Sequence, residues 1–328
     1  MFWIRIKYRL GLFYKTVLFK LGFGKILLKN RYGERLLLFH GIDTKGDTRY
    51  NSRFISKLFF EALIKHIVTH YNVVSLDDYY LKKFKKDTLN IALTFDDGYL
   101  NNYTYAVPIL EKYKVPACFY ITTVHENTPY LWTDFIDLVS YYTKKEKVVF
   151  KGDLYEKNAK NEFICHGVSL KNVAKRMPYK SIKLIYKIFE NDWKNLPPKH
   201  HETYWRLMNA EQIRYIANHP LFTIGAHGET HASLIDIPLE AAKHEISNSK
   251  KQLETICRQP ITEFAFPFGF YNHEIANYCE EIGFERLLLV DYNTKEDTKK
   301  QAFKNRFVMN PYLSFELQLA YLLKGSYF

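Results

Sequence analysis

Short runs rich in Leu, Ile, Val, Phe and Ala alternate with longer amphipathic stretches along most of this chain of 328 residues. This alternation is typical of parallel β/α units, in which a helix returns the chain to the same end of the sheet after each strand. The expected strands are residues 35–40, 72–76, 90–95, 117–122, 222–227, 263–268, 286–290 and 306–309. The expected helices are residues 54–71, 102–113, 210–218, 238–256 and 273–282. This pattern favours an α/β barrel of seven or eight strands over an open sheet.

Residues from about 125 to 209 break this rhythm. Helical patterns occur at residues 131–142 and 181–193, whereas strand signals are few. We therefore expect a mainly helical insertion within one domain, because no linker separates its two sides. The expected organisation is a basic, aromatic N-terminal segment at residues 1–34, followed by the barrel with its insertion at residues 35–328.

The chain carries a formal charge of +12 and has an isoelectric point near 9.2, which favours an anionic partner. Nucleic acid, a membrane surface and an acidic glycan would all fit this charge. No nucleic-acid-binding motif accompanies the basic residues, so we expect no nucleic-acid partner. The four cysteines lie too far apart for a zinc cluster, and we interpret them as reduced thiols.

The first 33 residues contain eight Lys or Arg residues and no acidic residue, yet they are rich in Phe, Leu, Ile and Tyr. Lys15, Lys20 and Lys25 make a membrane span unfavourable, and no cleavable signal is visible. Two interpretations stay open: a basic helix that packs on the domain, or a peripheral segment on an anionic membrane. We expect a cytoplasmic protein, which under the second interpretation lies at the inner face of the membrane.

Asp96 and Asp97 directly follow the expected strand 90–95, in the sequence LTFDDG. Polar residues past the carboxyl end of a parallel strand lie at the face where active sites form, and Gly98 permits a tight turn. The pair also resembles the Walker B element of nucleotide hydrolases, but the chain has no matching phosphate loop. A solvated Asp-Gly turn is the structural alternative.

His227 and His231 stand in the sequence TIGAHGETHASL. Their spacing is that of the HExxH zinc-protease helix, but Gly228 stands where that motif needs Glu, and a helix with Gly225 and Gly228 is improbable. We therefore place both histidines at a strand end and its loop. Two imidazoles and one carboxylate are a common catalytic site for a divalent metal, although a purely structural pair is the alternative.

Pro267 and Gly269 lie at another expected strand end, in the sequence EFAFPFGFYN. A constrained backbone at this point can direct an N–H group toward a reacting oxygen.

The motifs TFDDG, GAHGETHASL and FAFPFGFYN, in this order, resemble those of the polysaccharide deacetylases, family four of the carbohydrate esterases. The stretch LLLFHGI at residues 36–42 is similar to the first strand of members with this type of third motif. The resemblance covers about residues 35–310, apart from most of the insertion. It implies a distorted (β/α) barrel and a divalent metal ion, with zinc expected, that serves to remove acetyl groups from N-acetylated sugars.

The resemblance also implies roles for individual residues, carried over by motif position. Asp97, His227 and His231 would hold the metal, and Asp96 would be the base that takes a proton from the attacking water. The backbone N–H of Phe268 would stabilise the oxyanion of the tetrahedral intermediate.

The chain departs from the family pattern at two places. Ala265 stands where many members have an Arg that orients the base, and no histidine follows His273, although many members have a late histidine as the acid. We therefore expect His40 at the end of the first strand to be the acid, with His125 as a weaker candidate. The alternative for His40 is a purely structural histidine of the core or of the strand end.

We expect substrate contacts from four residues: Tyr99, Trp132, Pro267 and Gly269. The insertion should pack near the mouth of the site, where three more aromatic residues could help to select the sugar: Tyr141, Trp193 and Trp205. Alternatively, most of these aromatic side chains form the core of the insertion.

The expected function is metal-dependent deacetylation of an N-acetylated sugar in a glycan or lipid-linked saccharide. Two alternatives stay open. The enzyme could remove formyl or cleave another non-peptide C–N amide bond on a similar sugar, or the chain could be a non-catalytic glycan-binding or assembly protein.

Overall fold

The computed structural model of the chain describes residues 32–49, 51–126, 128–196 and 205–327, together with five positions of the N-terminal segment: Gly11, Tyr14, Val17, Leu18 and Leu21. The segment expected at residues 1–34 therefore lies almost wholly outside the described residues, and so does the side chain of His125. Among the helices that the structure describes, none is both long and apolar enough to cross a membrane.

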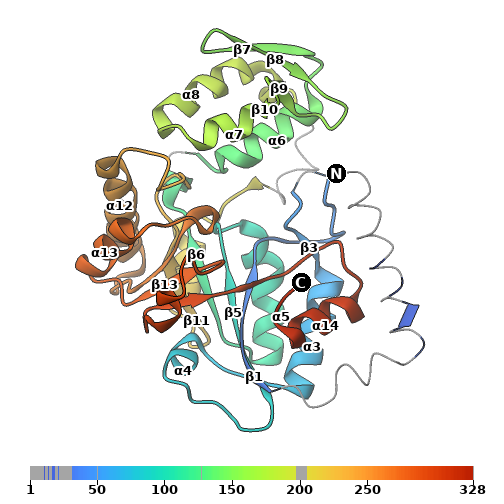
Figure 1. The fold of residues 1–328 in the computed structure, drawn as a ribbon, viewed down its shortest axis with the longest axis vertical. Helices are drawn as coiled ribbons and strands as arrows, with labels where there is room; N and C mark the ends of the chain where they lie inside the picture. Colours follow the sequence, from blue (N-terminus) through green and yellow to red (C-terminus); the bar gives the residue numbers. More distant parts are fainter. Residues whose placement is uncertain are drawn as a thin grey trace.

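A sheet of parallel strands forms the centre of the molecule (Figure 1). Eight strands follow one another in the order β14-β13-β12-β11-β6-β5-β1-β15 and form a nearly closed barrel, which confirms the expected fold class; β4 pairs with β5 beside this path. The strands are β1 (Gly33–Phe39), β4 (Asn72–Val73), β5 (Leu89–Phe95), β6 (Ala117–Ile121), β11 (Phe222–Ala226), β12 (Glu263–Ala265), β13 (Arg286–Leu289), β14 (Phe303–Asn305) and β15 (Phe307–Val308). A separate short pair is formed by β2 (Ile42–Asp43) and β3 (Ile55–Ser56).

Helices surround the barrel (Figure 1). They are α3 (Lys57–His70), α4 (Leu76–Tyr80), the π-helix η1 (Asn102–Ala106), α5 (Val107–Tyr113), α11 (Ala210–Ala217), α12 (Leu239–Cys257), α13 (His273–Glu281) and α14 (Phe315–Lys324). Three single 3-10 turns complete the barrel: η2 (Thr123–Glu126), η3 (Pro267–Gly269) and η4 (Glu296–Lys299). Side chains that accept a hydrogen bond from the first turn define several starts, such as Ser56 for α3 and Asn209 for α11. The short helix α4 and the terminal helix α14 were not expected.

The two faces of each strand bury different sets of side chains. Phe39, Phe95 and Phe119 stack on adjacent strands and pack with Phe60 of α3, in the core between the barrel and its helices. The alternate residues of the strands, among them Leu36 and the small residues Ala92 and Ala265, pack with the tyrosines of α4. Alternation along a strand thus separates the two cores, as the period of two requires.

The insertion contains a four-stranded sheet beside its helices, and the sequence did not predict this sheet. Its elements are α6 (Trp132–Tyr142), β7 (Lys147–Phe150), β8 (Asp153–Lys157), β9 (Phe163–Cys165), β10 (Val168–Ser169), α7 (Leu170–Lys175), α8 (Tyr179–Ile188) and α9 (Glu190–Lys194). The four strands form an antiparallel sheet with the order β10-β9-β8-β7.

Turn chemistry explains this sheet. Lys151-Gly152 and His166-Gly167 form two-residue hairpin loops, in which all four residues have positive φ. Such loops match the twist of paired strands. Because the strands are short and half of their side chains face water, the apolar signal in the sequence is weak, and the two X-Gly pairs were the usable sign.

Candidate active site

The candidate residues meet at the carboxyl ends of neighbouring strands. Asp96 and Asp97 follow β5, His227 follows β11, and His40 follows β1. The Asp96 N–H donates to the carbonyl of Phe39 at 2.9 Å, and the His227 N–H donates to the carbonyl of Ile121 at 3.0 Å. The sheet ladder therefore continues one residue past each strand and fixes where these side chains leave the backbone.

Positive φ angles direct two of the candidate ligands. Asp97 has φ 75° and His231 has φ 58°, in the left-handed region that costs energy for residues other than glycine. Glu245 of α12 stabilises the loop before His231, because its Oε2 accepts the N–H groups of Glu229 and Thr230. Such backbone strain is typical of functional sites, so it indicates that the surrounding structure holds the side chains of Asp97 and His231 in position for a function.

Asp97, His227 and His231 form a group with the geometry of a metal site. One ligand atom from each residue lies within 4.8 Å of the others, and all three residues are buried. Nε2 of His231 lies 3.1 Å and Nε2 of His227 lies 3.5 Å from Oδ1 of Asp97. Both carboxylate oxygens of Asp97 are nevertheless without a hydrogen-bond partner among the described residues. A buried carboxylate left in this state, facing two imidazole nitrogens, fits a divalent cation held between them.

The ring of His227 is oriented by the backbone. Its Nδ1–H donates to the carbonyl of Ala265 at 2.7 Å, which leaves Nε2 free to act as a ligand. Burial lowers the pKa of His227, but the carboxylates of Asp96 and Asp97 outweigh burial and raise it. For His231, burial lowers the pKa and the attraction of Asp97 does not compensate.

Asp97 also faces a cation. Nη1 of Arg53 lies 3.4 Å from Oδ2 of Asp97. Burial alone would raise the pKa of Asp97, but Arg53 and the two imidazoles hold it well below its usual range. The carboxylate is therefore ionised, as a metal ligand must be.

Arg306 binds Asp96 from the opposite side, and sequence reasoning missed it. Its Nη1 and Nη2 donate to Oδ1 and Oδ2 of Asp96 at 2.6 and 2.8 Å, and its Nε donates to the carbonyl of Leu289 at 3.2 Å. Burial raises the pKa of Asp96, but Arg306 more than compensates and lowers it. Arg306 thus supplies the cation that is missing at Ala265. It was visible only as the first residue of the expected strand 306–309.

His40 lies among the charged groups of this site. Loss of hydration and the nearby charge of Arg53 lower its pKa to about 3, although Asp97 and Asp96 oppose the shift. The imidazole is therefore neutral near neutral pH. His125 lies in η2, but its side chain is outside the described residues, so its candidacy stays a prediction.

The third motif forms η3 beside the ligands. Phe268 has φ 61°, and its ring lies 4.5 Å from the ring of His231. Gly269 has φ 73°, and a Cβ there would lie 2.6 Å from Cγ2 of Val290, so only glycine fits. Pro267 is buried against the ligand loop, where a Cβ on Gly228 would meet Pro267 Cγ at 3.4 Å. The oxyanion role of the Phe268 N–H, and substrate contacts from Pro267 and Gly269, stay predictions.

The positions of Tyr99 and Trp132 correct the expectation that they line the substrate site. Tyr99 is 0% exposed and its hydroxyl donates to Asp134 at 2.7 Å. Trp132 is 1% exposed and its Nε1 donates to the carbonyl of His231 at 3.2 Å. Both side chains therefore support the site from inside the protein.

The other aromatic residues of the insertion pack mainly on one another. The ring of Trp193 meets that of Trp205 edge to face at 5.3 Å and lies tilted at 4.8 Å from the ring of Phe135, a core residue of the insertion. Tyr141 lies against Tyr142. These contacts favour the core interpretation over direct selection of a sugar.

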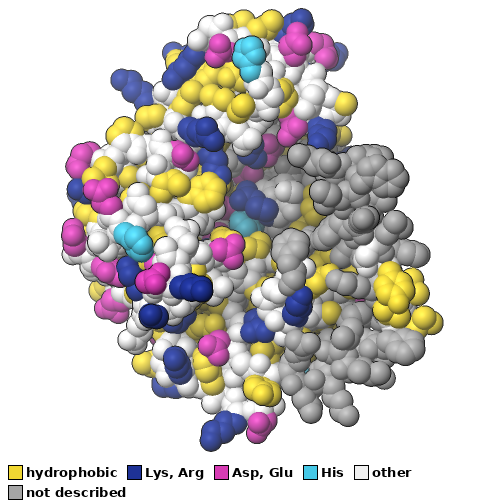
Figure 2. All heavy atoms as spheres, in the orientation of Figure 1, with side chains coloured by type: hydrophobic (Ala, Val, Ile, Leu, Met, Phe, Trp, Pro, Cys, Tyr) yellow, Lys and Arg dark blue, Asp and Glu magenta, His cyan; other side chains and the backbone are white. Residues whose placement is uncertain are grey.

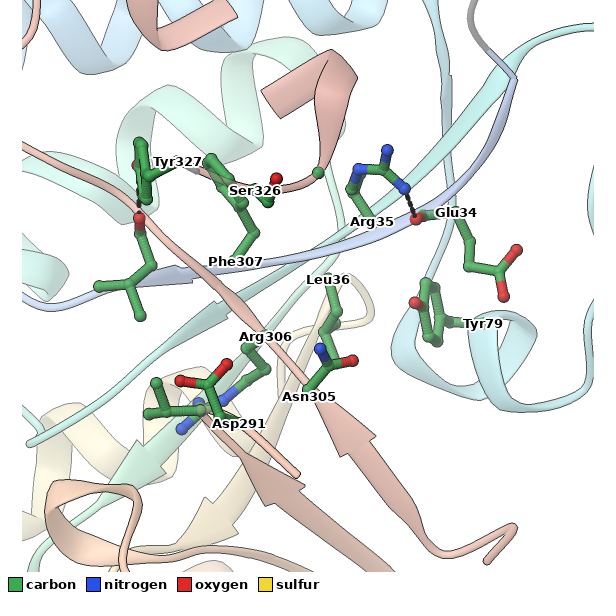
Figure 3. A pocket seen from close by; sticks show the side chains of 13 residues that line it. Glu34, Arg35, Leu36, Tyr79, Asp291, Asn305, Arg306, Phe307, Ser326 and Tyr327 are labelled. Carbon is green, nitrogen blue, oxygen red and sulfur yellow. Dashed lines mark hydrogen bonds between the residues drawn. The ribbon is translucent and has the colours of Figure 1, made fainter. Parts of the chain in front are cut away.

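A separate cavity of about 320 Å³ lies where the two ends of the barrel path meet (Figure 3). Arg306 and its neighbours Asn305 and Phe307 line it, with Glu34 and Asp291 at its edge. The metal-site residues are not among those that line this cavity. Arg306 therefore lines the cavity where the barrel path closes and also binds the buried carboxylate of Asp96.

Replacing Arg306 tests the importance of this pair for stability. We expect Arg306→Met to lower the free energy of unfolding by about 3–5 kcal/mol, because it leaves the Asp96 carboxylate buried without its cation. Adding Asp96→Asn should recover part of the loss. Urea denaturation is the measurement.

An exposed pair of the same length is the matched control. Lys147 and Glu156 also lie 2.6 Å apart but are about 60% exposed, so Lys147→Met should change stability by about 0–1 kcal/mol. Equal losses in Lys147→Met and Arg306→Met would contradict a special role for the buried pair.

Comparisons with known proteins agree with this geometry. The profile of a family described as polysaccharide deacetylase matches residues 83–287, more than half of the chain. Poly-beta-1,6-N-acetyl-D-glucosamine N-deacetylases of Staphylococcus aureus strains MSSA476 and N315 are 33% identical to the chain over 133 residues. That match covers 39% of this chain and 42% of each relative's length.

Solved structures show a similar fold. The Streptococcus pyogenes deacetylase PplD in complex with acetate has a TM-score of 0.56 at 14% identity, covering 88% of this chain and 99% of that one. IcaB from Ammonifex degensii has a TM-score of 0.52 at 16% identity, covering 89% and 98%. With the family profile spanning most of the barrel and the metal-site residues in place, this chain belongs to the polysaccharide deacetylase family.

Proposed function

We propose that this chain is a zinc-dependent hydrolase that removes acetyl groups from N-acetylated sugars of a glycan. The observation that carries the proposal is the buried group of Asp97, His227 and His231 beside the carboxylate of Asp96. Membership in the family and similarity to N-acetylglucosamine polymer deacetylases support the reaction type. The match spans less than half of those relatives, so the glycan itself is part of the proposal.

The donor set suits zinc. Two neutral imidazoles and one carboxylate leave an open position for catalysis in a tetrahedral zinc site. When bound, the metal supplies Lewis acidity toward the acetyl carbonyl and makes water a better nucleophile at neutral pH.

The chain's own residues would divide the proton transfers. Asp96 accepts a proton from the attacking water, while Arg306 holds both carboxylate oxygens in place. The N–H of Phe268 donates to the oxyanion that forms on the acetyl carbonyl. His40 then donates a proton to the sugar nitrogen as the C–N bond breaks, which yields acetate and a free amine.

The neutral state of His40 constrains this last step. Because its pKa is lowered to about 3, His40 is a neutral imidazole in the resting protein and lacks the additional proton of an imidazolium acid. It must gain one during the reaction, and the attacking water is the source at hand. We therefore propose that the proton taken from water is passed on to the leaving amine within the site.

Metal content tests the ligand group. We expect Asp97→Ala and His231→Ala to lose the stoichiometric metal of the purified protein, measured by elemental analysis, because each removes one of three ligands. His244→Ala is the matched control, since the side chain of His244 is 70% exposed on α12 and should leave the metal content unchanged. Metal retained in both ligand variants would contradict the site.

The choice of leaving group tests His40. We expect His40→Gln to lower kcat for an N-acetyl sugar by about 10²–10⁴-fold, the usual contribution of a general acid or base. An activated aryl acetate needs no protonation of its leaving group, so its hydrolysis should fall much less. Asp96→Asn should slow both substrates, and a His40 variant that slows both equally would rule out the acid role.

We also propose that the basic N-terminal segment brings the chain to an anionic membrane. Eight cationic residues among aromatic and aliphatic ones support peripheral attachment. The full chain should sediment with vesicles that contain anionic lipid at low salt and be released at high salt. A chain without residues 1–31 should stay in solution, and equal behaviour of the two would contradict the proposal.

A further inference from the structure

Besides Trp132, a lysine of the insertion lies beside the candidate site. Phe268 of the third motif packs against the core of the insertion. Lys175, the last residue of α7, places Nζ 3.8 Å from the centre of the Phe268 ring and 4.2 Å from that of Phe270. The ring of Phe268 in turn touches His231, so one aromatic ring separates this ammonium group from a candidate metal ligand.

Figure 2 shows the molecule hollowed between the insertion above and the barrel below, with cationic, acidic and histidine side chains in and around the hollow. Lys175 of α7 lies over the ring of Phe268, at the contact between the insertion and the third motif. A glycan that places an acetamido group at the metal site would extend along this hollow, and the insertion forms one of its walls.

Lys175 pairs with none of the carboxylates among the residues that the structure describes. No described carboxylate lies within ion-pair distance of its Nζ, and its close contacts are the two aromatic rings. Burial lowers the pKa of Lys175; Asp236 opposes this shift, and Lys171, Arg53 and Arg176 reinforce it. Aromatic faces attract a cation but do not neutralise it, so the charge is available to an anion.

Arg53 is a second cation at the same place. Its side chain is 30% exposed and contacts Asp97 and Tyr99, and its charge acts on Lys175. Its contacts with Asp97 Oδ2 and with the Tyr99 hydroxyl are both long, at 3.4 Å. A divalent cation on Asp97 would repel Arg53, so an anion that approaches from the hollow would be a better partner for it.

We infer that Lys175, together with Arg53, binds an oxyanion group of the substrate, so that the preferred glycan carries a carboxylate or phosphate next to its N-acetylated sugar. This inference rests on the proposed function and names the class of glycan. The charge of +12 on the chain fits such a substrate, because it favours the approach of polyanions.

A comparison of neutral and anionic substrates tests the inference. The metal-loaded full chain would be assayed for acetate release from a neutral N-acetylglucosamine oligomer, from the same oligomer with a phosphate substituent, and from an oligomer that alternates N-acetylhexosamine with uronic acid. We expect kcat/KM to be higher for at least one anionic oligomer, with an advantage that shrinks at high salt. The oligomer that gains identifies the source of the negative charge.

Variants of Lys175 separate recognition from mere packing. Lys175→Met keeps the apolar stem and should reduce the ratio of anionic to neutral kcat/KM by about tenfold, as expected for a charge-assisted contact. Lys175→Arg should retain most of the ratio. Lys183→Met is the matched control, because Lys183 is an exposed lysine of the same insertion that lies over the ring of Tyr179, and it should leave the ratio unchanged.

The outcomes distinguish this inference from the proposed function. If Lys175→Met slows neutral and anionic oligomers equally, or if the neutral oligomer is preferred, the inference is wrong while deacetylation stands. If no oligomer releases acetate, the proposed function is wrong. In that case, calorimetry would measure the affinity of the Asp96→Asn protein for the same oligomers. Equal affinity for neutral and anionic oligomers would show that the inferred recognition of an oxyanion is wrong.

Discussion

The adjacent buried carboxylates of Asp96 and Asp97 can both be ionised because each faces its own positive groups. Arg306 binds Asp96 through two hydrogen bonds, and Arg53 and the imidazoles face Asp97. Without these partners, burial and mutual repulsion would force one of the carboxylates to take up a proton. The two carboxylates can therefore serve different tasks. Asp96 is held by hydrogen bonds from Arg306, whereas both oxygens of Asp97 lack a hydrogen-bond partner among the described residues.

The barrel makes this division possible. Parallel strands bring side chains from distant parts of the chain to one end of the sheet. Backbone hydrogen bonds to the neighbouring strand, which continue the sheet pairing by one residue, hold the backbone of Asp96 and of His227 in place. The third motif then closes the site from β12, where the carbonyl of Ala265 fixes the ring of His227. The insertion adds Trp132 beneath the His231 loop, so its helices support the centre as well as bordering it.

Local signals in the sequence were sufficient for most of the barrel and for the metal group. Strand ends followed by Asp, His or Gly are short-range patterns, and they predicted a site of two histidines and one carboxylate; the resemblance to the family then implied Asp97, His227 and His231, which the structure places together. The Arg306 partner of Asp96 lies 210 residues away and has no pattern of its own, so only the closure of the barrel reveals it. The sheet of the insertion was missed because its strands are short and have a weak apolar pattern. The X-Gly pairs of its hairpin turns were the only clear sign of it among the described residues.

Arg306 lies between β14 and β15, where the barrel path begins and ends. Nearby, Arg35 of β1 donates to the carbonyls of Leu322 and Leu323 in α14, groups 287 and 288 residues away. The charge of Asp96 therefore depends on a residue beside the strands that close the barrel path. A barrel opened between β14 and β15 would keep both aspartates and both histidines in place on their own strands but would lose the cation that keeps Asp96 charged, so closure of the barrel and ionisation of this carboxylate are one event.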